Sequence, residues 1–107
     1  MKRLILALFA LSQAGMASAS STGTGYLTQY VIQNGIAFFW HNGTRSTPPA
    51  CDGGVRFSIN VTTPAGQAAL AGLLTAFSSH KPITIMGTGA CSDWVDTEAM
   101  QYFSVTY

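Results

Sequence analysis

Residues 55–86 read VRFSINVTTPAGQAALAGLLTAFSSHKPITIM, which predicts a strand, a helix and a second strand in immediate succession. Apolar and polar side chains alternate from Val55 to Val61, as in a strand with one buried face. The odd-numbered apolar residues are therefore expected to face the core. The residues expected to face solvent are Arg56, Ser58 and Asn60.

The helix in this stretch has clear signals at both ends. Thr63 suits the N-cap, and Pro64 suits the first helical position because no helical hydrogen bond needs its missing N–H. The helix is predicted over residues 65–79. Lys81 favours the helix end, and Pro82 stops the helix.

An apolar stripe runs along this helix at helical spacing and consists of Leu70, Leu73, Leu74 and Phe77. We expect it to pack on Phe57 and Ile59. The residues expected to be buried in that contact are Leu70, Leu74 and Phe77. The other apolar positions are alanine or glycine, which allow close backbone approach. Two interpretations follow: tight packing of the helix on the sheet, or association with copies of itself in a homo-oligomer.

Upstream lies a predicted hairpin. Residues 26–33 and 36–41 are rich in β-branched and aromatic side chains and flank Asn34-Gly35. This dipeptide predicts a type I′ turn, because both central positions of that turn need positive φ. The preceding Ser/Thr/Gly-rich residues 20–25 are expected to form a mobile leader.

The remaining segments complete the order of elements. Residues 44–50 contain Pro48-Pro49 and form a loop, residues 91–98 form a polar loop, and residues 99–107 alternate as a closing strand. One helix after three strands and before two predicts an α+β domain. We expect a small antiparallel sheet or a partly open OB-like barrel of about five strands, with one helix packed on it.

The start of the chain predicts export. Lys2-Arg3 precedes an apolar segment over residues 4–11 that is too short to cross a bilayer, and small residues end at Ala17-Ser18-Ala19. These are the three parts of a secretory signal peptide. We expect residues 1–19 to be removed and residues 20–107 to form a single exported domain, periplasmic or secreted, with no stable membrane insertion after cleavage.

Two cysteines follow, Cys51 and Cys91. In an oxidising compartment, the only two cysteines of an exported domain are expected to form a disulfide with each other. Closing a loop of about 40 residues stabilises a fold by about 4 kcal/mol in the chain-entropy model. A metal-binding or reactive pair is the alternative, but the two residues lack close spacing and neighbouring ligands.

Composition excludes several classes of partner. Without Lys2 and Arg3 the chain keeps three basic and four acidic side chains, so it is nearly neutral. A nucleic-acid-binding domain needs a clustered basic surface, and so does a domain that binds anionic membranes. Neither partner is expected.

No motif predicts catalysis or a cofactor. Gly87-Thr88-Gly89 lacks the third glycine and following helix of a dinucleotide site, so backbone conformation is the expected role of its glycines. Asp93, Asp96 and Glu98 could offer oxygen ligands to calcium, but they form no EF-hand loop, and an exposed acidic loop is the alternative. We expect a non-enzymatic protein without metal or cofactor.

The candidate binding residues are aromatic and acidic. Trp94 lies between Asp93 and Asp96 in the loop that begins at Cys91, and Trp40 precedes a turn. An indole can stack on the apolar face of a sugar while carboxylates accept its hydroxyl hydrogen bonds. We expect Trp94, Asp93, Asp96 and Trp40 to form the recognition surface. The alternative is that Trp94 plugs the open end of the sheet.

Residues 63–94 read TPAGQAALAGLLTAFSSHKPITIMGTGACSDW. With this stretch, the arrangement from Arg56 to Tyr107 is similar to that of short exported proteobacterial proteins that are largely uncharacterised. More distantly, the arrangement resembles the B subunits of subtilase-cytotoxin-like and pertussis-like toxins. Those subunits are OB-fold domains that form pentamers around their helices and bind glycans. The resemblance implies a glycan-binding oligomer, and it assigns no glycan-binding residue.

Two functions are therefore expected from the sequence. The first is an exported binding module that recognises a glycan or another envelope component as a toxin-B-subunit-like oligomer. The second is a small envelope inhibitor or structural protein that acts through a protein partner.

Overall fold

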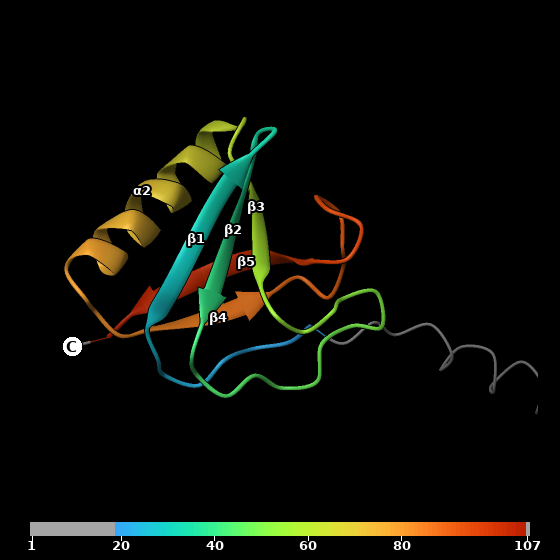
Figure 1. Cartoon of the computed structure of the whole chain (residues 1–107), viewed down its shortest axis with the longest axis horizontal. Helices are drawn as coiled ribbons and strands as arrows, with labels where there is room; N and C mark the ends of the chain where they lie inside the picture. Colours follow the sequence, from blue (N-terminus) through green and yellow to red (C-terminus); the bar gives the residue numbers. More distant parts are fainter. Residues whose placement is uncertain (1–18, 107) are drawn as a thin grey trace, which may run out of the picture.

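The computed structural model describes residues 19–106 of the chain, so most of the predicted signal peptide lies outside the described residues. Five strands and one helix follow the predicted order (Figure 1). Their bounds are β1 Leu27–Gln33, β2 Ile36–His41, β3 Phe57–Asn60, α2 Pro64–Ser78, β4 Ile83–Gly87 and β5 Glu98–Val105.

The strands form one sheet in the order β1-β2-β3-β5-β4. All neighbouring pairs are antiparallel except β3 and β5, which are parallel. In Figure 1, β4 and β5 cross the direction of β1 and β2, while α2 lies beside the sheet. The expected α+β domain, with five strands and a single helix on a sheet that does not close, is confirmed.

The residues before β1 do not form the expected mobile leader. Isolated bridges join Ser21 to Met86 and Gly25 to Ile83, so this segment runs along the free edge of β4. Ser20 and Thr22 are buried. The expectation was wrong because β4 needs a partner for its outer backbone groups, and a short polar segment without bulky side chains can supply one.

The hairpin turn and the start of the helix form at the residues that the sequence predicted. Asn34 and Gly35 have φ values of 51° and 75°, as the type I′ turn requires. The Thr63 side chain accepts a hydrogen bond from the Gly66 amide at 3.0 Å, and Pro64 opens the helix. A side chain at position 66 would collide with the Asn60 carbonyl, so Gly66 lets the helix start directly after β3.

The helix presents a different face from the expected one. Leu73 and Ala76 are buried, Leu70 is partly buried, and Phe77 is 37% exposed with its ring edge-on to Tyr30. Phe57 and Ile59 are buried in the core, as expected. Position 72 explains the rotation: a Cβ there would lie 2.7 Å from Phe103 Cζ, so this glycine lets the helix approach β5.

The alternation around β3 also differs in part from its prediction. Val55 is 64% exposed because β3 begins only at Phe57, and Ser58 is fully buried although it was expected to face solvent. The face that carries Ser58 is covered by other parts of the chain, so both faces of β3 are buried.

Within residues 19–106, no helix is both long and apolar enough to span a bilayer.

This helix face gives a stability prediction. Leu73→Ala should lower the free energy of unfolding by about 2–5 kcal/mol, because a fully buried side chain leaves a cavity. Phe77→Ala should cost only about 1–2 kcal/mol, since its ring is partly exposed and its contact with Tyr30 contributes about 0.5–1.5 kcal/mol. Urea denaturation of both variants checks this order. A larger loss for Phe77→Ala would place the helix in the orientation that the sequence predicted.

Candidate functional site

The outer face of β2 and β3 carries a second, smaller packed layer. Phe38 on β2 and Ser58 on β3 are fully buried there. The Trp94 ring packs edge-on to Phe38 with centroids 5.0 Å apart, and the Arg56 guanidinium lies 3.9 Å from the Phe38 ring centroid. The loop between β4 and β5 is thereby folded onto this face.

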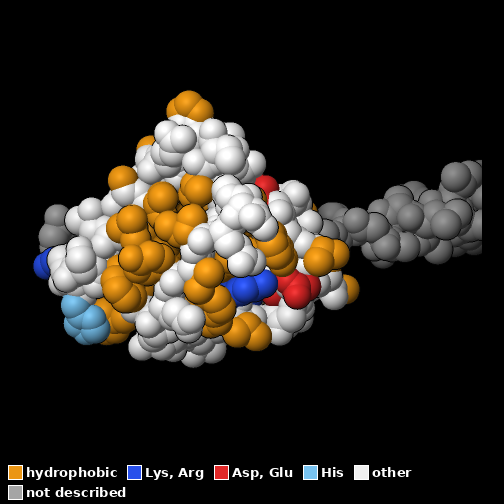
Figure 2. Space-filling view, turned by 45° about the horizontal axis from the view of Figure 1, so that its top comes forward, with side chains coloured by type: hydrophobic (Ala, Val, Ile, Leu, Met, Phe, Trp, Pro, Cys, Tyr) orange, Lys and Arg blue, Asp and Glu red, His pale blue; other side chains and the backbone are white. Residues whose placement is uncertain are grey.

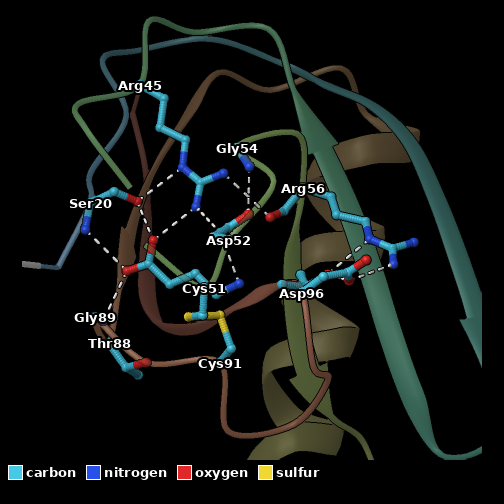
Figure 3. A network of polar contacts seen from close by, with 12 residues as sticks. Ser20, Arg45, Cys51, Asp52, Gly54, Arg56, Thr88, Gly89, Cys91 and Asp96 are labelled. Atoms are coloured by element: carbon cyan, nitrogen blue, oxygen red, sulfur yellow. Dashed lines mark hydrogen bonds and ion pairs between the residues drawn. A yellow bond between two sulfur atoms is a disulfide. The ribbon is translucent and has the colours of Figure 1, made fainter. Parts of the chain in front are cut away.

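A groove of about 260 Å³ opens beside this layer. Its lining residues are Trp40, Asp52, Gly53, Val55, Arg56 and Asp96. The Arg56 guanidinium carbon lies 5.6 Å from the Trp40 ring, and its Nη2 lies 3.5 Å from Asp96 Oδ1. Figure 3 shows the side chains of Arg56 and Asp96 side by side. Figure 2 shows basic, acidic and apolar side chains adjoining on one face of the domain.

Covalent and backbone bonds fix the walls of the groove relative to each other. Cys51 and Cys91 form a disulfide with a Cα–Cα distance of 6.2 Å, which confirms the predicted pairing. The Gly53 amide donates to the Asp96 carbonyl at 3.1 Å. Both bonds join the loop before β3 to the loop before β5. A groove held in this way would lose little conformational entropy on binding a ligand.

The four residues predicted to form the recognition surface lie in different places in the structure. Trp40 and Asp96 line the groove together. Trp94 is half-buried because it covers Phe38, and Asp93 lines a different hollow beside Met100. The four residues do not form one surface, and the predicted set lacked Arg56, which the alternation of β3 had assigned simply to solvent.

A buried polar network lies near the disulfide (Figure 3). Arg45 Nη2 contacts Asp52 Oδ2 at 2.6 Å and Glu98 Oε1 at 2.8 Å. The guanidinium also donates to Ser20 Oγ at 2.9 Å and lies 4.0 Å from the Phe57 ring centroid. The two carboxylates are almost completely buried, and the Arg45 side chain is 12% exposed.

Glu98 was expected in an exposed acidic loop, and that expectation was wrong. It is the first residue of β5 and is fully buried. The Gly89 amide donates to Glu98 Oε2 at 2.8 Å, with Gly89 at φ 85°. A side chain on Gly87 would collide with the same carboxylate. The two glycines of Gly87-Thr88-Gly89 thus have backbone roles, as predicted, and they serve this carboxylate.

The network holds its own charged groups in place. Asp52 accepts hydrogen bonds from the amides of Gly54 and Glu98 at 2.6 and 2.8 Å, in addition to the Arg45 ion pair. In the described part of the chain, no group of three or more His, Cys, Asp or Glu side chains is placed to hold a metal ion. The network joins the segment before β1, the connection between β2 and β3, and the start of β5. The groove presents an indole, a guanidinium and a carboxylate to solvent.

Comparison of the chain with protein-family models, with characterised proteins and with solved structures finds no match. The resemblance to exported proteobacterial proteins and toxin B subunits therefore stays a prediction. The disulfide is compatible with a location outside the cytoplasm.

Proposed function

We propose that this protein is a non-enzymatic binding module, exported to the periplasm or beyond, that recognises a glycan in the groove beside Trp40. The observation that supports this most directly is the grouping of Trp40, Arg56 and Asp96 around one hollow whose walls are cross-linked. Asp52 also lines the groove, but its carboxylate is bonded to Arg45 in the buried network, so the exposed groups of Trp40, Arg56 and Asp96 are the ones proposed to bind.

The chemistry of the groove favours a hydroxyl-rich ligand. The indole offers an apolar face on which a sugar ring can stack. Arg56 supplies hydrogen-bond donors and Asp96 supplies acceptors, and the two charges balance each other. The volume of about 260 Å³ lies just below the usual range of ligand pockets, ~300–1,000 Å³, and suits a single sugar ring at the end of a chain.

Trp40→Ala tests this proposal. A stacked indole typically contributes about 2 kcal/mol or more, so the affinity for the best-bound sugar should fall about 30-fold. A glycan array identifies that sugar, and calorimetric titration measures the loss. Melting of the variant checks that the domain remains folded.

Fluorescence supplies a matched control, because the chain has only two tryptophans. In Trp94→Phe the remaining Trp40 should report sugar binding by a change in emission. In Trp40→Phe the remaining Trp94 should report much less, since it packs on Phe38. Equal signals from both variants, or an array without any bound glycan, would contradict the proposal.

A protein partner is the second candidate, and one feature favours it. Strand β1 is at the end of the strand order, and Tyr30 and Ile32 on it are exposed. An exposed edge strand can pair with an added strand from another protein. Replacing Ile32 by lysine should then abolish complex formation while Trp40→Ala leaves it intact, which separates the two functions.

A further inference from the structure

The backbone nitrogen of Ser20 also belongs to the buried network, because it contacts the Glu98 carboxylate. The Ser20 nitrogen donates to Glu98 Oε2 at 3.0 Å, and the Ser20 hydroxyl donates to Glu98 Oε1. Ser20 is fully buried, whereas Ala19, one residue earlier, is exposed. The chain therefore enters the folded domain at the bond between these two residues.

The charges of this network do not balance while that bond is intact. Within residues 19–106, Arg45 is the one cation that forms an ion pair with the two carboxylates, Asp52 and Glu98, so this cluster carries one excess negative charge. Burying an uncompensated charge is expensive, and buried charges are normally paired. The described residues supply no second cation to this cluster. The Ser20 nitrogen, 3.0 Å from Glu98 Oε2, is the other atom in contact with Glu98 that could carry a positive charge.

We infer that the chain is cut between Ala19 and Ser20, and that the new α-ammonium group of Ser20 forms a buried ion pair with Glu98. A peptidase that selects small residues before the cut adds water across this peptide bond. The Ala19 carbonyl carbon leaves as a carboxylate, and the Ser20 nitrogen becomes a primary amine that is protonated near neutral pH. Two carboxylates then face two cations.

The site is built to receive this group. Gly87 leaves space for the Glu98 carboxylate, Gly89 donates a backbone hydrogen bond to it, and the Gly87 amide donates to the Ser20 carbonyl at 2.8 Å. Both backbone polar groups of Ser20 are therefore bonded: its nitrogen to Glu98 and its carbonyl oxygen to the Gly87 amide. Processing at this bond completes the fold and makes the domain more stable than a chain that keeps residues before Ser20. This inference is independent of the proposed glycan site.

The first experiment determines the cut. The full-length gene is expressed with its own leader, and the exported protein is analysed by intact mass and N-terminal sequencing. The expected first residue is Ser20. A mature protein that starts at any other residue would overturn the inference, because its amine could not reach Glu98 in the same way.

The second experiment measures the ion pair. Two glycines are inserted between Ala19 and Ser20 of the precursor, so that cleavage after Ala19 leaves the amine two residues away from Glu98. The extended protein should melt at least about 5 °C below the protein that starts at Ser20. Glu98→Gln should lower the melting temperature of the Ser20 protein more than that of the extended protein.

Chemical labelling provides a readout that does not depend on Glu98→Gln being able to fold. In the native Ser20 protein the α-amine should resist acetylation, because it is buried and paired. In the glycine-extended protein the α-amine should react at the rate found after unfolding. Mass spectrometry of the N-terminal peptide measures both rates. Equal reactivity in the two native proteins, together with equal melting temperatures, would show that Glu98 does not bind the terminus.

Discussion

Arg45→Met is expected to lower the free energy of unfolding by about 3–5 kcal/mol, the usual effect of removing one partner from a buried ion pair. The methionine can still cover the Phe57 ring, but it leaves Asp52 and Glu98 buried without the guanidinium that contacts both. For a domain of this size, that is a large part of its total stability. Urea denaturation followed by tryptophan fluorescence measures the loss.

Asp96→Asn is the matched control for this prediction. It removes one charge from the pair with Arg56, which is longer, at 3.5 Å, and more exposed than the Arg45 pairs. An exposed pair contributes only about 0–1 kcal/mol. If the two substitutions destabilised the domain equally, the network around Arg45 would have no special role in stability.

Replacing both cysteines by serine is expected to cost about 4 kcal/mol, because the unfolded chain then regains the freedom of a loop of about 40 residues. The bond lies next to Asp52 in the sequence and joins the loops on which the groove depends. We therefore expect glycan affinity to fall together with stability. Thermal melting and sugar titration check the two effects separately.

A reductant supplies the control for the cysteine variant. Wild-type protein unfolded and refolded in excess reductant should match the melting temperature of the double serine variant, since both lack the same covalent bond. A reduced wild-type protein as stable as the oxidised one would contradict the prediction, because the loops would then be held by their other contacts alone.

The elements of this fold could be predicted because their signals are local. Asn34-Gly35 specifies its turn through two positive φ values, and Thr63-Pro64 specifies a helix start through a cap and a missing donor. The rotation of the helix could not be predicted in this way. It depends on the approach of Gly72 to Phe103, a residue of the last strand, and the helical stripe alone does not specify that contact.

Some residues of the candidate site could be predicted from the sequence, but their grouping in space could not. An aromatic residue before a turn and an acidic residue in a loop indicated Trp40 and Asp96, and the structure brings both to one groove. Arg56 was missed because strand alternation takes no account of a loop that folds over the outer face. The burial of Glu98 in the polar network was not predicted, because its partners Ser20 and Arg45 are distant from it in sequence. One sequence signal could have indicated that Glu98 is buried: it directly precedes residues 99–107, which alternate as a strand and carry no charge.

The pairing of the residues before β1 with β4 has a consequence for folding kinetics. Ser20 contacts Glu98, 78 residues later in the chain, and Ser21 bridges to Met86. Folds dominated by such non-local contacts fold slowly, typically over milliseconds to seconds, because loop closure precedes the stabilising contacts. The sheet cannot be completed until β5 is available to pair with β3 and β4. If the protein is exported as proposed, we expect the domain to fold only after its last strand has crossed the membrane.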